Sequence, residues 1–334
     1  MNKQFDVVIG NPPYNNSMYT KFGETAFELL KPDGITVQIT PCKFYALESG
    51  DNKHFRETVM THMDELHVYK SCQDVFDIAE VSGITYWRAH KNKVFTSKHV
   101  TNYNSNAVLQ SSREEHTEQP LQLMPLKCLA LITKINNAAN NKHLFDNYKL
   151  SLCYYTVHSK ISGHDKIYED DVEFMTGLGG QLHQDGYLSI RELKHTDGID
   201  KYKVTHNTMI YSGTGLAPDS TNRYWGPASA SYIKPGQIIK GSYVIAGFFD
   251  TEQEALSFLS YLNSQLVSFI IANSIASCQY SSQSNWRHVP ALPAGYTFDH
   301  IYTDNELFDI FGLTTEEKDL ITSLIKPRSE KEDH

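Results

Sequence analysis

The chain has 334 residues, of which 40% are hydrophobic and 21% charged, an ordinary composition for a folded protein and enough chain for two domains. It has no apolar run of the roughly 18 residues that a membrane helix needs, and its N-terminus lacks the apolar core of a signal peptide, so we expect a cytoplasmic location. The net charge of −9 excludes a uniformly basic nucleic-acid-binding surface.

The charge is unevenly distributed along the chain. Residues 191–245 hold seven basic and four acidic side chains, whereas residues 246–334 hold five basic and thirteen acidic ones. Because the local field steers a polyanion, the first of these segments can still approach nucleic acid. The five cysteines form no Cys-x-x-Cys pair, which disfavours both a disulfide framework and a zinc site. We therefore expect reduced, mostly buried thiols and no metal.

The first 95 residues alternate predicted strands and helices. Phe5–Ile9 is a short, β-branched apolar run, which predicts a buried strand that stops at Pro12 and Pro13. The remaining elements follow from apolar spacing and turn residues: a helix over 19–31 ended by the turn residues 32–34, a strand over 35–40, a helix over 52–63, and strands over 65–69 and 81–87. This alternation predicts a mostly parallel α/β sheet.

The pattern changes beyond residue 92. Polar residues dominate 92–120, which predicts a linker or a long insertion, and an amphipathic helix follows over 125–138. Residues 154–243 predict an irregular, strand-rich region. Helix returns over 250–275 behind the cap residue Thr251. It returns again over 304–325, as one or two helices with a cap-like start at Thr314. We therefore expect a partial catalytic domain over 1–95, a linker and connecting helix over 96–150, and a mixed α/β target-recognition domain over 151–334.

The sharpest chemical signal is Asn11-Pro12-Pro13-Tyr14, directly after the first predicted strand. The prolines stiffen the loop, and the Pro12 carbonyl is free to accept a hydrogen bond. The Asn11 amide oxygen is a second acceptor, and Tyr14 adds a flat ring. Two fixed acceptors beside a stacking ring suit the amino group of a planar base, because its nitrogen becomes more nucleophilic when both hydrogens are held. The alternative is a Pro-Pro turn with an incidental Asn and Tyr.

Residues 5–14 (FDVVIGNPPY) resemble the catalytic motif of type IIG-like adenine-specific DNA methyltransferases from restriction–modification systems. The resemblance implies that Asn11 and Pro12 hold the amino group of an adenine flipped out of the duplex, that Pro13 stiffens the loop, and that Tyr14 stacks on the base. It also implies S-adenosylmethionine as methyl donor and double-stranded DNA as partner.

Two later segments extend this resemblance. Residues 34–44 (GITVQITPCKF) are similar to the strand and loop that follow the motif, and residues 76–87 are similar to a late strand of the same enzymes. An aromatic side chain of that late strand often touches the flipped base. Tyr86 and Trp87 are therefore candidate substrate-binding residues, with packing in the sheet core as the alternative for either ring.

The segment from residue 241 to 314 resembles the target-recognition domain of these methylases. We expect residues 154–243 to read the DNA target, because basic and aromatic side chains mix there and such a mixture contacts phosphates and stacks on bases. Ordinary surface lysines of a Tyr-rich domain are the alternative. The set consists of Lys201, Lys203, Arg223, Tyr224, Trp225, Tyr232, Lys234 and Lys240.

The cofactor site is the missing part of the resemblance. The family carries it on a glycine-rich loop ahead of the catalytic motif, and only ten residues precede Asn11. The glycine clusters at 177–180 and 211–215 neither follow a clear apolar strand nor open a helix. We therefore expect an incomplete class I methyltransferase (Rossmann-like) sheet and very weak binding of S-adenosylmethionine by the chain alone. We also expect either a partner chain that pairs with the strand at 5–9 or a longer coding region of which this chain is a fragment.

The function expected from these observations is site-specific methylation of adenine in duplex DNA. One alternative is a DNA-recognition subunit or inhibitor without catalytic activity. Another is methylation of a different amino-bearing substrate, such as RNA or a protein glutamine, which the long recognition-like half disfavours.

Overall fold

The computed structural model divides into two compact units, residues 1–131 with 273–278 and residues 132–272 with 279–334. The structure describes the following residues: 3–42, 44, 50–69, 72, 75–76, 83–103, 110–116, 126–148, 151–152, 154–155, 161–166, 168–178, 181–207, 230–241, 243–274, 286 and 288–327.

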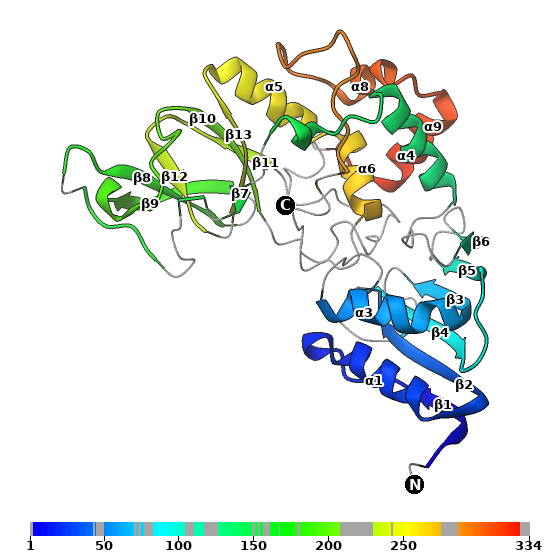
Figure 1. Cartoon of the computed structure of the whole chain (residues 1–334). Coiled ribbons are helices and arrows are strands. Elements are labelled where there is room, and N and C mark those ends of the chain that lie inside the picture. The colour runs from blue at the N-terminus through cyan, green and yellow to red at the C-terminus, as the bar shows by residue number, and fades with distance from the viewer. Residues whose placement is uncertain are drawn as a thin grey trace. The chain divides into compact units, whose positions relative to one another are not determined.

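A six-stranded sheet with the order β1-β2-β4-β3-β5-β6 forms the first unit (Figure 1). β1 pairs with β2, and β3 with β5, in parallel, while β4 runs antiparallel to both of its neighbours and β6 runs antiparallel to β5. The expected mostly parallel sheet is therefore wrong, and the sheet is mixed. The strands are β1 (Phe5–Gly10), β2 (Leu30–Pro41), β3 (Met63–Tyr69), β4 (Ile84–His90), β5 (Ser97–Tyr103) and β6 (Ser111–His116).

Two helices, α1 (Met18–Glu28) and α3 (Gly50–Val59), lie beside this sheet, flanked by the short helices η1 (Asn15–Ser17) and η2 (Met60–His62) (Figure 1). Phe55 of α3 and Trp87 of β4 are fully buried, with their rings 5.5 Å apart in an edge-on contact. Side chains alternate across a strand, so Trp87 marks the helix-covered face, and its neighbour Tyr86 points to the opposite side, here called the second face.

β1 forms one edge of the sheet, and its apolar side chains are exposed rather than buried. Val7 is 50% and Ile9 76% exposed. They pair in register with Ile35 and Val37 of β2, which places them on the second face. The predicted strand is thus present, but the expectation that it is buried is wrong.

The segment expected to be a linker instead extends the sheet. β5 and β6 lie within residues 96–116 and pair with each other, and β5 also pairs with β3. The turn expected at residues 32–34 lies inside β2, because β2 already begins at Leu30. Helix α4 (Leu126–Ala138) occupies the position expected for the connecting helix.

The second unit is rich in strands, as expected for residues 154–243. One sheet has the order β11-β10-β13-β7 and the other β12-β8-β9. Their strands share a core that includes Phe174, Ile238 and Ile245. The strands are β7 (Ser151–Leu152), β8 (Val172–Leu178), β9 (Gln181–Leu188), β10 (Tyr202–Asn207), β11 (Ala230–Ile233), β12 (Gln237–Ile239) and β13 (Tyr243–Phe249).

The helices of the second unit begin at threonine caps. The side chains of Thr251, Thr303 and Thr314 each accept a hydrogen bond from the backbone N–H of the glutamate three residues later. The side chain of that glutamate in turn accepts a hydrogen bond from the backbone N–H of the threonine. The expected caps at Thr251 and Thr314 are confirmed. These helices are α5 (Glu252–Leu262), α8 (Asp304–Ile310) and α9 (Thr315–Leu324); α6 (Gln265–Ser274) and the short helices η5 (Leu144–Asp146) and η6 (Ile190–Glu192) complete the set.

No single helix in the described part of the chain is long and apolar enough to cross a membrane. The pair α5 and α6 reaches the required length only together, and it is bent by 53° between the two helices. Most side chains of this pair are buried inside the second unit.

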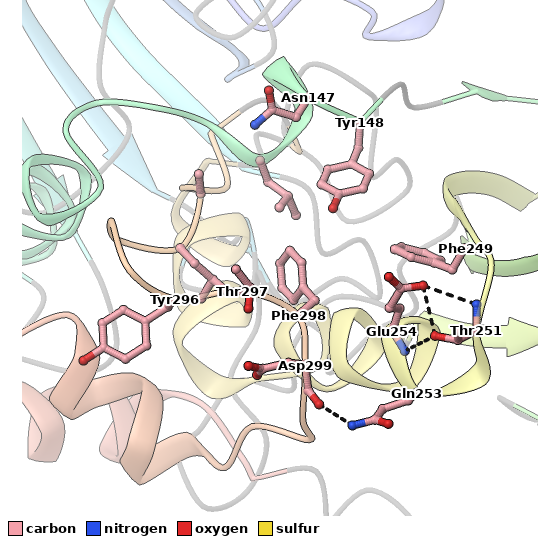
Figure 2. Close-up of a pocket in the computed structure, with 13 residues that line it drawn as sticks. Asn147, Tyr148, Phe249, Thr251, Gln253, Glu254, Tyr296, Thr297, Phe298 and Asp299 are labelled. Carbon is pink, nitrogen blue, oxygen red and sulfur yellow. Dashed lines mark hydrogen bonds between the residues drawn. The ribbon is translucent and has the colours of Figure 1, made fainter.

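A cavity of about 600 Å³ opens in the second unit (Figure 2). It lies where β13 leads into α5, and the segments 144–148 and 291–299 form the rest of its wall. Nothing in the sequence pattern indicated this cavity, because its wall comes from segments more than a hundred residues apart.

Candidate functional site

The strand directions bring several strand ends to one edge of the first sheet. β1, β2, β3 and β5 all run the same way, since β4 is antiparallel to β2 and to β3. Their carboxyl ends, and the loop Asn11–Tyr14 that follows β1, therefore share one edge. In open α/β sheets, ligands bind in the crevice outside the carboxyl ends of the strands.

The Asn11–Tyr14 loop is anchored by one buried side chain and by a hydrogen bond between two of its own residues. The Pro12 side chain is buried, whereas Asn11 and Pro13 are exposed. The Tyr14 hydroxyl donates a hydrogen bond of 2.9 Å to Oδ1 of Asn11. Partial burial raises the pKa of Tyr14 above its usual value, with smaller contributions from Cys72 and Cys42. Tyr14 is therefore a neutral donor at physiological pH, and its hydrogen bond uses one of the two lone pairs of the oxygen that the sequence assigned to an amino group.

Gly10 allows the loop to leave the sheet close to a buried side chain. A Cβ atom added at Gly10 would lie 2.3 Å from Oε1 of Gln38. Gln38 is 2% exposed, and its Nε2 donates a 2.9 Å hydrogen bond to Oγ1 of Thr36. A side chain in place of Gly10 would therefore displace the Gln38 amide.

The two aromatic candidates on β4 have different environments. Trp87 is fully buried, and its indole Nε1 donates a 3.1 Å hydrogen bond to Oγ1 of Thr40. Trp87 is therefore part of the core and not accessible to a base, which corrects its assignment as a candidate contact. Tyr86 is half-buried on the second face, with one side of its ring stacked on His67 at 4.0 Å.

Tyr86 belongs to a row of rings that the sequence did not reveal. Tyr69 and Tyr103 stack at 4.6 Å on the neighbouring strands, and His67 connects them to Tyr86. All four side chains lie on the second face near the carboxyl edge, because Tyr69 and Tyr103 end β3 and β5. The alternation His67-Val68-Tyr69 was the available signal for this row.

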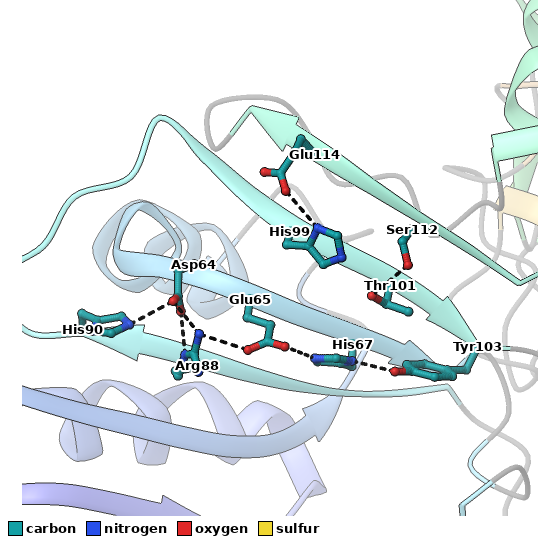
Figure 3. Close-up of polar contacts among 10 residues, drawn as sticks. All are labelled: Asp64, Glu65, His67, Arg88, His90, His99, Thr101, Tyr103, Ser112 and Glu114. Atoms are coloured by element: carbon teal, nitrogen blue, oxygen red, sulfur yellow. Dashed lines mark hydrogen bonds and ion pairs between the residues drawn. The ribbon is translucent and has the colours of Figure 1, made fainter.

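A chain of polar contacts crosses the second face beside these rings (Figure 3). Arg88 forms two hydrogen bonds with Asp64, of 3.0 and 2.7 Å, and lies 3.1 Å from Glu65. Glu65 contacts His67, which in turn contacts the Tyr103 hydroxyl. Burial alone would raise the pKa of Asp64, but the hydrogen bonds from Arg88 and His90 outweigh burial and lower it. The carboxylate of Asp64 therefore stays ionised.

The two lysines predicted to contact phosphate in the second unit have different environments. Lys201 is exposed and paired with Asp250, which raises its pKa. Lys203 is fully buried, and its ammonium donates to the carbonyl oxygens of Gly198, Ile199 and Lys201. Lys203 therefore closes a turn and has no donor for a phosphate, which corrects its assignment. Arg223 and Trp225 lie outside the described residues.

We predict that Lys203→Met lowers the free energy of unfolding of the second unit by about 2 kcal/mol, because three carbonyl oxygens lose their buried donor. Burial lowers the pKa of Lys203 to about 8. Between pH 8 and about 10.4 the unfolded chain binds more protons at this lysine than the folded chain, so its contribution to stability rises with pH there. Urea unfolding at several pH values should show this rise lost in the variant.

Lys201→Met is the matched control for this prediction. Its side chain is exposed and paired at the surface, so its loss should change the free energy of unfolding by less than about 1 kcal/mol. Burial also lowers the pKa of Lys98 in the first unit to about 8. Both lysines therefore contribute to the pH dependence of wild-type stability, and only a comparison between variants isolates the contribution of Lys203. Equal effects of the two substitutions would contradict the role assigned to Lys203.

Among the residues that the structure describes, the two glycine clusters supply no cofactor loop. Gly177 and Leu178 end β8 and lead into the antiparallel strand β9 rather than into a helix, and residues 211–215 lie outside the described part. No described residue is therefore assigned to S-adenosylmethionine. Within the described ranges there is also no cluster of three or more His, Cys, Asp or Glu side chains that could hold a metal.

The loop at the carboxyl edge coincides with a family similarity. Residues 1–76 match the Eco57I restriction-modification methylase family. The matched segment contains β1, the Asn11–Tyr14 loop, β2 and β3, whereas Tyr86 and Trp87 of β4 lie beyond it. It supports a methyltransferase function in general terms. No curated protein matches the chain.

Several solved restriction-modification proteins are distantly similar. The M protein of the type I enzyme EcoKI is 16% identical, with coverage of 30% of this chain and 25% of that one and a TM-score of 0.26. The type IIG endonuclease BpuSI is 10% identical (99% and 55%, TM-score 0.36). The type IIL enzyme MmeI, solved with DNA, is 8% identical (97% and 55%, TM-score 0.43). The chain thus spans between a quarter and about half of the length of these proteins.

Proposed function

We propose that this chain is the catalytic and target-recognition part of a site-specific DNA adenine methyltransferase that uses S-adenosylmethionine as methyl donor. The observation that carries the proposal is the Asn11-Pro12-Pro13-Tyr14 loop at the carboxyl edge of the sheet, inside the segment that matches the methylase family. An exposed amide oxygen and an aromatic ring at such an edge suit a planar base with an amino group.

The loop residues have distinct parts in this proposal. Pro12 anchors the loop through its buried side chain, and its carbonyl oxygen accepts one hydrogen of the base amino group. Asn11 Oδ1 accepts the other hydrogen with its second lone pair, while the Tyr14 hydroxyl donates to the first. The Tyr14 ring then stacks on the flipped base. Both acceptors increase the electron density on the nitrogen, which makes it a better nucleophile.

The test is a methylation assay on the chain purified with whatever travels with it from its native host. Duplex DNA and isotopically labelled S-adenosylmethionine are supplied, and the DNA is digested to nucleosides for mass analysis. We expect N6-methyladenine. Labelled N4-methylcytosine would show that the substrate is cytosine and not adenine. DNA binding with no methyl transfer in any preparation would indicate a non-catalytic recognition module.

Tyr14 offers a prediction that separates its ring from its hydroxyl. Tyr14→Phe should stay within about threefold of wild-type activity, because stacking is kept and only the bond to Asn11 is lost. Tyr14→Ala should lose about 10- to 100-fold, because a base–aromatic stack contributes about 1–3 kcal/mol. Steady-state kinetics of both variants decide this. Equal losses would reject the stacking role and assign Tyr14 to positioning Asn11.

We further propose that a partner strand pairs with the free edge of β1. Among the described strands, β1 pairs with β2 alone, and its Phe5, Val7 and Ile9 side chains are 44%, 50% and 76% exposed. An exposed apolar edge strand pairs with another chain or aggregates. A polypeptide that carries a cofactor-binding strand would complete both the sheet and the chemistry.

Ile9→Lys tests this partner. Since Ile9 is 76% exposed, the variant should unfold within about 0.5 kcal/mol of wild type but recover much less of the co-purifying chain and of the methylation. Val94→Lys is the matched control, because Val94 is 71% exposed in the same unit and lies outside the named strands. Partner recovery that is equal for both variants would show that the β1 edge is not the contact.

The second unit is proposed to read the DNA sequence. Its strand-rich part from 154 to 243 contributes exposed Lys201, while Arg223 and Trp225 remain proposals from the sequence alone. Phosphate contacts position a protein on the duplex, and base contacts specify the site. Loss of Lys201 should weaken binding to all sequences alike and reduce its dependence on salt.

A further inference from the structure

The cavity of the second unit has a fixed aromatic wall. Tyr148, Phe249 and Phe298 line it, and Figure 2 shows the three rings around the same space. The fully buried Phe258 lies behind them, with ring centroids 4.9, 4.9 and 5.0 Å from Tyr148, Phe249 and Phe298. Because Phe258 contacts all three rings, little side-chain ordering is needed when a ligand enters.

Two carboxylates, Glu254 and Asp299, line the same cavity, and no lysine, arginine or histidine is among the residues of its wall. Glu254 is fixed in place: its Oε2 accepts bonds from the backbone N–H of Thr251 (3.2 Å) and from Thr251 Oγ1 (3.0 Å). Within the described part of the chain, Glu254 has no ion pair. Its negative charge is therefore directed at the cavity without a protein counter-charge.

Asp299 is partly compensated. It accepts a 2.6 Å hydrogen bond from His300, which also contacts Glu306. The backbone oxygen of Asp299 accepts a hydrogen bond from Gln253, which ties α5 to the segment 291–299. Glu254 is thus the main source of negative potential at the wall. Burial raises the pKa of Tyr148, and the nearby Glu254 adds to that effect.

This combination selects among ligand classes. A phosphate or carboxylate would meet two negative groups and no cation. A purely apolar ligand would remove water from the Glu254 carboxylate without supplying a positive charge in its place, and the removal of a charge from water costs free energy. A cation on an alkyl or planar stem satisfies both parts, since carboxylates attract it and aromatic faces bind cations through their quadrupoles. The volume of about 600 Å³ lies in the range of small-molecule sites.

We propose that this cavity binds an organic cation, an ammonium or guanidinium group on an alkyl stem, with the head between Glu254 and Tyr148 and the stem against Phe249 and Phe298. This site is separate from the proposed methyl transfer, which belongs to residues of the first unit. The same chemistry occurs in a free polyamine and in a basic side chain presented by a peptide.

Calorimetric titration of the whole chain tests the proposal and separates the two sources. Spermidine probes the free polyamine, and the blocked tripeptide acetyl-Gly-Arg-Gly-amide probes a presented side chain. The same tripeptide with neutral citrulline in place of arginine is the control ligand. We expect saturable binding of one ion per chain for spermidine or the arginine peptide, and none for the citrulline peptide.

Two variants locate the site. Glu254→Gln keeps an oxygen for the Thr251 cap but removes the charge, and Tyr148→Ala removes a ring; each should weaken binding at least about tenfold. Glu317→Gln is the matched control, because Glu317 has the same capping position on α9 and lies outside the cavity. It should bind like wild type. If Tyr148→Ala fails to fold, Glu254→Gln and its control still decide the question.

The proposal is overturned by any of three results. The first is no saturable binding of either cation up to about 10 mM. The second is wild-type affinity in Glu254→Gln. The third is an equal loss in Glu317→Gln, which would assign the binding to the general negative charge of the protein.

Discussion

Replacing Asn11 with alanine should reduce methyl transfer at least about a hundredfold while DNA affinity stays within about threefold. The loss corresponds to about 3 kcal/mol of transition-state stabilisation, the size found when one fixed hydrogen-bonding group at a reacting centre is removed. Asn11 is exposed at the strand end, so its removal disturbs no core packing. Single-turnover methylation and DNA titration with the same protein measure the two quantities.

Asn15→Ala is the control for this substitution. Asn15 is an exposed asparagine of the same loop region, at the start of η1, and it lies outside the four-residue motif. Its variant should methylate at the wild-type rate. Full activity of Asn11→Ala in the reconstituted system would reject the assigned site, whereas equal losses in both variants would indicate a general effect on the loop.

The largest loss of stability should follow Trp87→Ala, about 3–5 kcal/mol for the first unit. The side chain is fully buried, its indole donates to Thr40, and its ring contacts Phe55. The substitution removes these contacts and leaves a cavity beside α1 and α3. Urea unfolding followed by circular dichroism, with attention to separate transitions of the two units, gives the change in free energy.

Trp87→Phe is the companion variant for this prediction. It keeps a ring against Phe55 and loses only the donor to Thr40, so it should lose about half as much stability or less. A Trp87→Ala protein of wild-type stability but without activity would contradict the core assignment and return Trp87 to the group of base-contact candidates.

Local chemistry in the sequence predicted where elements begin and end. The Pro-Pro pair ends β1, Pro41 ends β2, and the threonine caps start α5 and α9, because each of these signals acts within a few residues. The apolar run of β1 did not reveal its exposure. Such a run reads the same whether its neighbours cover it or not, and only the pairing of whole strands decides.

Long-range pairing accounts for the other differences. The sequences of β5 (SKHVTNY) and β6 (SSREEH) are polar. Polar side chains of the two strands contact one another in pairs, as His99 does with Glu114. Polar sequence therefore resembled a linker. Lys203 resembled a surface base because nothing local shows that three carbonyl oxygens of the preceding turn converge on its ammonium.

The strand order β1-β2-β4-β3-β5-β6 places the Asn11–Tyr14 loop directly after an edge strand of the sheet. β1 has hydrogen-bonded contact with one described neighbour, so its amide protons should exchange with solvent before those of the central strands β3 and β4. Whatever pairs with its outer side binds the ordered form preferentially and shifts the opening equilibrium towards it. The degree of order of Asn11 and the affinity of the β1 edge for a partner strand then depend on the same local opening equilibrium of β1.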